Sequence, residues 1–497
     1  MRWKSISTRR SRHACQKPVV NSISMDSQRD KDKVIHISRI YETNMAELTM
    51  LLKKRGHQVR GSDENVYPPM SDLLEQYDIT VQNGFDAKNL EPVPDLVVIG
   101  NALSRGNPEV EAVLERKLPY ISMAELLKEY VIRGKTSLVV TGTHGKTTTS
   151  SLLAWVFEFA GKKPGFMIGG IAENFVTSCQ YGIGSYFITE GDEYDTAFFD
   201  KRSKFFHYLP DQLILNNLEF DHADIFDSLE DIKKSFRLML RLIPQNGLIV
   251  ANGDDANLQN VLESAYSPVI KFGFGEANEV RAVIIETGES GTKFEVINKA
   301  QKNYLQSQKF ALKLSGKYNV LNSLGVIILA RHNGISDKII QAAFDSFKSV
   351  RRRQELRGEV NGVAVYDDFA HHPTAIRETI SAIKQKHNGR RLVAVFEPRS
   401  NTSVRKIHQQ ALIDSFKDAD EVILTTLHRL EKIPQEQRLE IKEVLKSLKN
   451  KNISAYEFPE VEEIIEHLKT NCRSGDVVLI MSNGKFENIH QRLLASL

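Results

Sequence analysis

Apolar and polar positions divide this chain into two kinds of segment. Short runs in which nearly every residue is apolar recur through the sequence: LVVIG, SLVVTG, LILNN, RLVAVF, EVILTT and DVVLIM. Such runs are typical of strands buried on both faces. Elsewhere apolar residues return every three to four positions, as on the buried side of a helix, and the first such pattern runs from Met45 through Leu52 and stops at Gly56. Strands alternating with helices predict an α/β fold built on parallel sheets.

The first part of the chain shows this alternation clearly. Val34–Ser38 is predicted to be a strand, and the helical pattern follows it directly. Further strands are predicted at Gln58–Gly61, Asp95–Gly100 and Pro119–Ser122. Residues 272–312 differ, because charged and apolar residues alternate there. That alternation predicts a small antiparallel insert.

The length of 497 residues is several times the roughly 150 residues of a typical domain. Two to four domains are therefore expected. Charged, turn-like segments at 132–136 and 348–351 separate the strand and helix patterns. We divide the chain there into domains at residues 26–134, 135–348 and 349–497, preceded by a basic extension at residues 1–25.

The charge balance excludes a broadly basic binding surface. Lys and Arg number 66 against 63 Asp and Glu, so the chain gives no general case for binding nucleic acid. Residues 1–25 stand apart, with six basic residues and no acid. This composition fits an organellar transit segment or a disordered extension upstream of a start at Met25, and we favour the second.

The sequence predicts a protein of the cytoplasm. No apolar run reaches the roughly 18 residues that span a bilayer, so no membrane insertion is expected. The cysteines, Cys15, Cys179 and Cys472, are far apart and form no CxxC pair. A reducing compartment fits this usage.

A Gly-rich turn lies where one predicted strand leads into a helix. Ser137–Val140 is the strand, Leu152–Phe159 is helical in pattern, and TGTHGKTTT joins them. In this context backbone N–H groups wrap a phosphate chain, a lysine reaches its outer oxygens and a threonine hydroxyl binds magnesium. Two residues separate the glycines rather than the usual four, so the loop is a variant. The predicted nucleotide-binding residues here are Gly142, Thr143, His144, Gly145, Lys146, Thr147 and Thr148.

Acidic and polar clusters follow two later strands. Glu190 ends the predicted strand YFITE and begins the run EGDEYD, and the run NNLEFDH ends at His222. Alone, each cluster is more often a solvated loop than a metal site. After a phosphate loop in the same domain, they favour magnesium, which prefers oxygen ligands.

Six motifs occur in one order: TGTHGKTTT, EGDEYD, NNLEFDH, SGKYNVLNSLG, RRRQELRG and DDFAHHPT. In this order they resemble the Mur ligase family, and the resemblance covers Val34 to Leu497. It implies three domains: a Rossmann-like N-terminal domain that binds a UDP-sugar, a central P-loop ATPase-type domain, and a Rossmann-like C-terminal domain that binds a peptide.

Other motifs, including RGNP, FFDKRSKF, EPRSNT and MSNG, are most similar to family members that act in peptidoglycan recycling. Those ATP-dependent carbon–nitrogen ligases join the murein tripeptide L-Ala-γ-D-Glu-meso-diaminopimelate to UDP-N-acetylmuramate. The resemblance implies ATP and Mg²⁺ as cofactors and an acyl phosphate intermediate. Two alternatives stay open: a ligase that adds L-alanine, and a degenerate nucleotide-binding member with impaired UDP-sugar binding.

The resemblance also implies roles for individual residues. The implied magnesium ligands are Thr147, Glu190 and His222. Further implied ATP contacts are Asn217, Asn319, Arg353 and Asp368, with Arg353 on the γ-phosphate side. The implied catalytic residues are Lys146, Glu190, His222, Arg353, His371 and His372. The implied substrate contacts are Ser62, Asp63, Asn101, Arg105, Arg399, Ser400, Asn401, Ser482 and Asn483.

Two of these assignments also rest on the residues themselves. Adjacent histidines rarely point at one ion, so His371 and His372 are predicted to be hydrogen-bonding groups rather than metal ligands. The guanidinium of Arg399 has the fork geometry that binds a carboxylate.

Some positions depart from the family pattern. Arg39 and Glu42 stand where the family has glycines that let the backbone approach the UDP diphosphate. Their side chains put UDP-sugar binding in question. Phe236 stands where several members carry a carbamylated lysine, so that modification is not expected.

Overall fold

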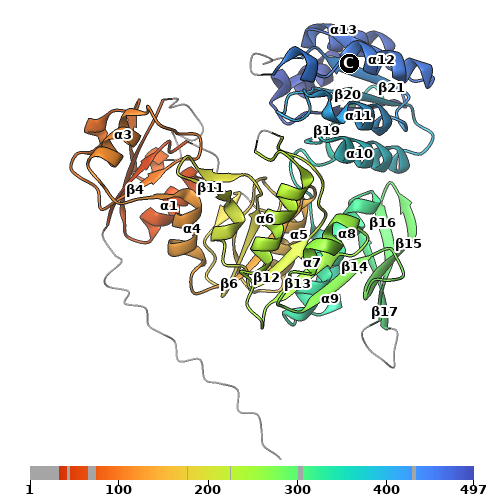
Figure 1. The fold of residues 1–497 in the computed structure, drawn as a ribbon. Helices are drawn as coiled ribbons and strands as arrows, with labels where there is room; N and C mark the ends of the chain where they lie inside the picture. Colours follow the sequence, from red (N-terminus) through yellow and green to blue (C-terminus); the bar gives the residue numbers. More distant parts are fainter. Residues whose placement is uncertain are drawn as a thin grey trace, which may run out of the picture.

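The computed structural model describes residues 33–41, 45–64, 74–175, 177–223, 225–299, 306–427 and 433–497. Three α/β units follow one another along the chain, coloured orange, yellow to green, and blue in Figure 1. Each unit is built on its own parallel or largely parallel sheet, which confirms the predicted fold class. The basic extension at 1–25 and Glu42 lie outside the described residues.

The N-terminal sheet has five parallel strands in the order β3-β2-β1-β4-β5. All strands predicted in this region are present, and β4 is buried along its whole length. The Asn107 side chain caps α3 by accepting from the N–H groups of Glu109 and Val110. The elements are β1 (Val34–Ser38), α1 (Met45–Lys54), β2 (Gln58–Asp63), β3 (Thr80–Asn83), η1 (Ala87–Leu90), β4 (Leu96–Ile99), α3 (Pro108–Glu115), β5 (Tyr120–Ser122), α4 (Met123–Leu127) and η2 (Lys128–Ile132).

The central sheet has ten strands in the order β17-β16-β15-β14-β13-β12-β6-β9-β7-β8. Strands β14 to β7 in this order are parallel, whereas β15, β16 and β17 pair antiparallel with one another. The predicted antiparallel insert is therefore confirmed. It extends the central sheet rather than forming a separate one, because β15 pairs in parallel with β14.

Helices cover both faces of the central sheet. Alternate residues of its strands face α6 and α7 on one side and α5, α8 and α9 on the other. The elements are β6 (Thr136–Thr141), α5 (Lys146–Phe159), β7 (Gly165–Met167), β8 (Cys179–Gln180), β9 (Tyr186–Gly191), β10 (Asp195–Ala197), β11 (Asp200–Ser203), η3 (Lys204–His207), β12 (Gln212–Leu215), α6 (Leu229–Leu240), β13 (Leu248–Asn252), α7 (Ala256–Leu262), β14 (Val269–Gly273), β15 (Val280–Gly288), β16 (Gly291–Asn298), β17 (Gln306–Leu312), α8 (Lys317–His332) and α9 (Asp337–Ser346).

The C-terminal sheet has six strands in the order β18-β19-β23-β20-β21-β22, and β18 alone pairs antiparallel. One apolar cluster lies under α10, α11 and α12, and another under α13 and α14. The elements are β18 (Glu355–Val360), β19 (Val363–Asp368), α10 (Pro373–Lys386), β20 (Leu392–Phe396), η4 (Lys406–His408), α11 (Gln409–Ser415), β21 (Glu421–Thr425), η5 (Gln435–Gln437), α12 (Ile441–Asn450), β22 (Ser454–Phe458), α13 (Val461–Asn471), β23 (Val477–Met481), η6 (Phe486–Asn488) and α14 (Ile489–Ser496).

The central sheet brings three polar loops to one edge. Thr141 at the end of β6 pairs with Gly191 at the end of β9 and with Leu215 at the end of β12. The Gly-rich turn, the EGDEYD segment and the NNLEFDH segment therefore start side by side. Within the described ranges, no helix combines the length and the apolar composition that a membrane crossing needs.

Candidate active site

The Gly-rich turn after β6 has a backbone that only glycine fits. Gly142 and Gly145 have φ angles of +133° and +82°. A Cβ at Gly142 would lie 2.9 Å from the carbonyl oxygen of Asn217, and one at Gly145 would lie 2.5 Å from Oδ1 of Asn322. Gly145 is also the N-cap of α5 and has no side chain to accept from the first N–H groups of that helix. These donors and the positive end of the helix dipole suit a phosphate chain.

The segment after β12 holds the Gly-rich turn from the other side. Asn217 Oδ1 accepts from the N–H of His144 at 2.8 Å, and Asn217 Nδ2 donates to the His144 carbonyl oxygen at 3.1 Å. The N–H of Glu219 donates to Thr143 Oγ1 at 2.8 Å. Asn217 is predicted to contact ATP. In the structure its side chain binds the backbone of the Gly-rich turn, which is also predicted to contact ATP.

Lys146 is the first residue of α5 and turns back over its own loop. Its Nζ donates to the Gly142 carbonyl oxygen at 2.7 Å and lies 2.9 and 3.1 Å from the carboxylate oxygens of Glu193. Burial by itself would lower the pKa of Lys146, but the charges of Glu193, Asp192 and Glu190 outweigh it and raise the pKa. The lysine is therefore held as a cation.

Thr147 and Glu190 place their side-chain oxygen atoms next to each other. Thr147 Oγ1 donates to Glu190 Oε2 at 3.1 Å, and the N–H of Gly169 donates to Glu190 Oε1 at 2.6 Å. Burial and the nearby charge of Asp192 raise the pKa of Glu190 to about 7. An added cation would favour the charged carboxylate, so the donor set fits a hard divalent ion.

His222 contacts the carboxylate of Glu193. Its Nε2 is 3.4 Å from Glu193 Oε1, and the same Glu193 carboxylate pairs with Lys146. The predicted metal ligands therefore fall into two places: Thr147 and Glu190 contact each other, and His222 contacts Glu193. Sequence reasoning did not single out Glu193, although it belongs to the quoted EGDEYD run.

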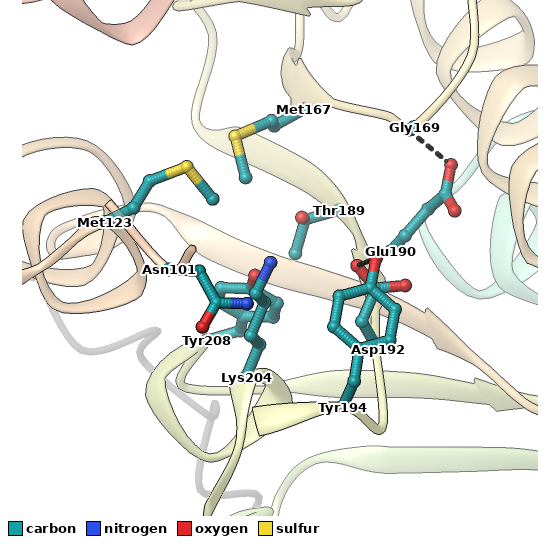
Figure 2. Close-up of a pocket in the computed structure, with 10 residues that line it drawn as sticks. All are labelled: Asn101, Met123, Met167, Gly169, Thr189, Glu190, Asp192, Tyr194, Lys204 and Tyr208. Carbon is teal, nitrogen blue, oxygen red and sulfur yellow. Dashed lines mark hydrogen bonds between the residues drawn. The ribbon is translucent and has the colours of Figure 1, made fainter. Parts of the chain in front are cut away.

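A cavity of about 330 Å³ lies between the N-terminal and central units (Figure 2). Asn101, a predicted substrate contact, lines it together with Glu190. Sequence reasoning missed Tyr194, Lys204 and Tyr208, which also line the cavity, and the only signal for Lys204 was its place in the FFDKRSKF motif. The complete lining is Asn101, Met123, Met167, Gly169, Thr189, Glu190, Asp192, Tyr194, Lys204 and Tyr208.

The other residues predicted to contact the UDP-sugar are engaged within the N-terminal unit. Ser62 is fully buried and its hydroxyl donates to Glu109 Oε2 at 2.7 Å. Asp63 Oδ2 accepts from the N–H of Tyr41 at 2.9 Å. Arg105 forms a two-pronged pair with Glu111 at 2.9 and 3.0 Å on the surface. Their role in substrate binding stays a prediction.

The structure shows the surroundings of two residues that depart from the family pattern, Arg39 and Phe236. Arg39 follows β1 with a φ of +72°, a conformation that costs a residue with a side chain about 1–2 kcal/mol. Arg39 therefore has a left-handed backbone conformation that favours glycine. Phe236 is buried, and its ring lies 5.4 Å from that of Phe205. This apolar packing suits the aromatic ring rather than a carbamylated lysine.

At the start of the C-terminal unit, Asp368 binds the backbone next to Arg353. Its carboxylate accepts from the N–H groups of Gln354 and Ala370, both at 2.8 Å. Burial raises the pKa of Asp368, and the charge of Arg353 opposes this rise. The Arg353 guanidinium lies over the ring of Phe369 at 5.0 Å.

Asn319 is joined by a second asparagine that sequence reasoning missed. Asn322 Nδ2 donates to Asn319 Oδ1 at 3.3 Å, and the Asn322 side chain reaches Gly145. The two asparagines are three residues apart in SGKYNVLNSLG, which places them on one face of α8. That spacing was the available signal.

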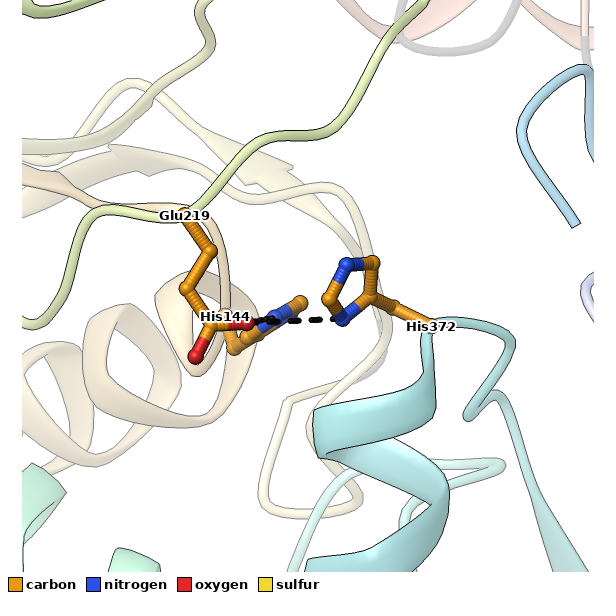
Figure 3. A group of neighbouring side chains, drawn as sticks. All are labelled: His144, Glu219 and His372. Carbon is orange, nitrogen blue, oxygen red and sulfur yellow. Dashed lines mark hydrogen bonds and ion pairs between the residues drawn. The ribbon is translucent and has the colours of Figure 1, made fainter. Parts of the chain in front are cut away.

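Glu219 joins the central and C-terminal units (Figure 3). Its Oε2 accepts from Thr374 Oγ1 at 2.7 Å and lies 3.2 Å from His144 Nε2 and 3.5 Å from His372 Nδ1. Burial raises the pKa of Glu219, but the hydrogen bonds from His144 and Thr374 and the charge of His144 together outweigh burial and lower the pKa to about 2. Burial together with the charge of His144 lowers the pKa of His372 to about 3, so this imidazole is neutral.

The atoms of His144, Glu219 and His372 are close enough to surround a metal ion. However, Thr374 already engages two of the three, because its N–H donates to His372 Nδ1 at 3.3 Å and its hydroxyl donates to Glu219. His371 Nδ1 lies 3.0 Å from the Phe369 carbonyl oxygen. Both histidines thus form hydrogen bonds within the protein, and their role next to the reacting groups stays a prediction.

The predicted peptide contacts meet at one edge of the C-terminal sheet, because Phe396 and Met481 pair at the ends of β20 and β23. Ser482 donates to Glu397, and Arg399 Nη1 lies 3.7 Å from Glu397 Oε1. Asn483 Oδ1 is buried without a partner among the described residues. Ser400 Oγ accepts from the N–H of Ser403 at 3.0 Å and stabilises the turn that carries Asn401.

Known proteins match the chain along nearly its whole length. Three models match in sequence order: Mur ligase family, catalytic domain, at residues 34–134; Mur ligase middle domain at 140–330; and Mur ligase, glutamate ligase domain, at 352–484. The UDP-N-acetylmuramate–L-alanyl-γ-D-glutamyl-meso-2,6-diaminoheptanedioate ligase of Escherichia coli K12 is 45% identical, over 93% of this chain and 98% of that ligase. This chain belongs to the Mur ligase family.

Other relatives are named for two different reactions. The crystal structure of a murein peptide ligase from Psychrobacter arcticus is 39% identical, with a TM-score of 0.68 over 93% of this chain and 98% of that one. The UDP-N-acetylmuramate–L-alanine ligase of Endomicrobium trichonymphae is 32% identical, over 94% of this chain and 99% of that ligase. Relatives named for the tripeptide reaction are thus more similar than this relative named for L-alanine.

Proposed function

We propose that this protein is an ATP-dependent ligase that joins L-Ala-γ-D-Glu-meso-diaminopimelate to UDP-N-acetylmuramate in peptidoglycan recycling. The observation that carries the proposal is the 45% identity, over 98% of its length, to the Escherichia coli ligase with that name. The reaction would take place in the cytoplasm, where ATP and nucleotide-linked sugars are made.

The chemistry of this reaction explains why ATP is needed. A carboxylate resists attack by an amine, because it is negatively charged and would have to expel oxide. Transfer of the γ-phosphoryl group to the carboxylate forms an acyl phosphate and releases ADP. The amine of the tripeptide then attacks the acyl carbon, loses a proton and displaces phosphate. Catalysis of phosphoryl transfer rests mainly on positioning and charge neutralisation.

The Gly-rich turn would hold the phosphates of ATP. Gly142 and Gly145 leave room for close approach, and the Lys146 cation would exchange Glu193 for phosphate oxygens. Thr147 and Glu190 would hold Mg²⁺, which supplies positive charge next to the transferred phosphoryl group. Asn319, Arg353 and Asp368 would contact the nucleotide from α8 and the C-terminal unit.

The C-terminal unit would bind the peptide. Arg399, Ser482 and Asn483 lie at the carboxyl edge of its sheet, where ligands of parallel sheets bind. The guanidinium of Arg399 would pair with a peptide carboxylate. On this assignment, residues 26–134, 135–348 and 349–497 form the UDP-sugar, ATP and peptide domains.

A product assay tests the function. Purified protein is incubated with ATP, Mg²⁺, UDP-N-acetylmuramate and the tripeptide, and the UDP-linked product and phosphate are measured by mass spectrometry and a colorimetric assay. Formation of both in equal amounts supports the proposal. Product from L-alanine but not from the tripeptide would instead identify an L-alanine ligase. ATP binding without either product would identify a nucleotide-binding member that has lost the reaction.

A further inference from the structure

Lys204 is a buried lysine that faces the cavity between the N-terminal and central units. It begins η3, directly after β11, and only 7% of the residue is exposed. Figure 2 shows its side chain rising between Asn101 and Tyr194 with the ammonium toward the middle of the cavity. The ammonium lies 4.7 Å from the centre of the Tyr194 ring. The positive end of this side chain is therefore presented to whatever occupies the cavity.

The charge of Lys204 has no anionic partner within the described part of the chain. Its ammonium forms neither an ion pair nor a hydrogen bond there, and it lies over the ring of Tyr194. Glu190 and Asp192 line the same cavity, but Glu190 accepts from Thr147 and Gly169, and Asp192 accepts from the Tyr194 hydroxyl. A buried cation without a partner is costly, so this arrangement suits an anion that arrives with a ligand.

The rest of the cavity matches one singly charged group on a sugar-sized ligand. Its volume of about 330 Å³ is in the range of small-molecule sites. Asn101 and Thr189 add single polar groups, while Met123 and Met167 provide apolar walls. A diphosphate needs many donors and carries more charge, which Glu190 and Asp192 would repel. A carboxylate needs only one cation and few donors.

The position of the cavity points to the carboxylate that reacts. Glu190 lines the cavity and also accepts from Thr147 in the phosphate loop. A carboxylate held in this cavity therefore faces the place where the γ-phosphate of ATP would lie. Both units contribute to the wall, so the ligand would bridge them.

We propose that Lys204 binds the lactyl carboxylate of UDP-N-acetylmuramate and places it for phosphorylation. This assignment rests on the proposed function. It separates two cations by role: Lys146 neutralises the phosphates of ATP, and Lys204 holds the acceptor.

The test compares two nucleotide sugars that differ in the carboxylate. UDP-N-acetylglucosamine carries the same diphosphate and sugar ring but lacks the lactyl group. Binding of each to the wild type and to Lys204→Met is measured by calorimetry without ATP. We expect Lys204→Met to weaken UDP-N-acetylmuramate binding about 10- to 100-fold, and to change UDP-N-acetylglucosamine binding less than about twofold. Equal weakening of both ligands would place the diphosphate at Lys204, and no weakening would remove Lys204 from binding; either result overturns the proposal.

Kinetics and control variants separate this role from a structural one. Lys204→Met should raise the KM for UDP-N-acetylmuramate, while the KM values for ATP and the tripeptide stay unchanged. Lys204→Gln is a second variant for the case in which methionine disturbs the fold. It is polar but uncharged, so it should show the same loss. Lys201→Met removes an exposed lysine three residues earlier, paired with Asp195 at 2.6 Å, and should leave all constants unchanged. If the wild type makes product and Lys204→Met retains full affinity, this assignment fails while the proposed function stands.

Discussion

The two junctions of the central unit are built in opposite ways. Toward the N-terminal unit there is a cavity, and the Lys204 ammonium faces it without an anionic partner among the described residues. Toward the C-terminal unit, the Glu219 carboxylate accepts from Thr374 and lies within ion-pair distance of His144 and His372. At the N-terminal junction, the charge of Lys204 is left facing a cavity. At the C-terminal junction, the charge of Glu219 is paired with groups from both units. The first therefore favours ligand binding at the expense of stability, while the second favours a fixed arrangement.

The largest effect is expected at the phosphate loop, which borders both junctions. Lys146→Ala should lower turnover by at least about a thousandfold, because on the proposed function the loop lysine would neutralise charge on the transferred phosphoryl group. Turnover is measured as phosphate release at saturating substrates, and circular dichroism checks that the variant is folded. Lys201→Ala serves as the matched control. Near-normal turnover in folded Lys146→Ala would remove the lysine from phosphoryl transfer.

The C-terminal junction should have a smaller, substrate-specific effect. Glu219→Gln removes the charge but keeps the size of the side chain, and the Glu219 N–H still donates to Thr143. We expect kcat/KM for the tripeptide to fall about tenfold, with the KM for ATP nearly unchanged, because the C-terminal unit would carry the peptide. Thr374→Val should act in the same direction. A loss confined to ATP binding would show that Glu219 serves the phosphate loop instead.

The two junctions should respond with opposite sign when their charges are removed. Lys204→Met should raise the melting temperature of the ligand-free protein by about 2–4 °C, since a buried, unpaired cation is lost. Glu219→Ala should lower it, since its hydrogen-bonded partners are left unsatisfied. Differential scanning fluorimetry without ligands measures both. A fall in both variants would mean that Lys204 stabilises the empty protein.

The smallest effect is expected in the dependence of stability on pH. The folded protein lowers the pKa of Glu219 to about 2, from an ordinary value of 4.5. A lowered carboxyl pKa stabilises the folded state above the unfolded value and loses that contribution as pH falls toward the folded value. The stability difference between wild type and Glu219→Gln should therefore be full at pH 7 and shrink below about pH 4.5. Urea unfolding at pH 7, 5 and 4 follows this difference, and a difference that grows in acid would contradict it.

The sequence predicted the local features of the site better than its connections. Glycine and lysine in a strand-to-helix turn identify the phosphate loop, because only a few backbone shapes fit that spacing. Asn217 is predicted from its motif to contact ATP, and the structure adds that its side chain binds the backbone of His144. Glu193 and Asn322 belonged to quoted motifs but were not singled out. The partner of Glu193 is Lys146, 47 residues away in the sequence. Asn322 lies next to Gly145, which is also far away in the sequence.

Apolar runs, helical spacing and glycine positions are local, and they were enough to predict α/β units on parallel sheets and the antiparallel insert at 272–312. Whether a polar residue is engaged or available depends on residues distant in sequence. Ser62 is an implied substrate contact and Lys204 lies in the FFDKRSKF motif. The fold pairs the hydroxyl of Ser62 with Glu109 and leaves the ammonium of Lys204 facing a cavity. The physical reason is that burial and pairing of charge are set by three-dimensional packing, which local spacing does not encode.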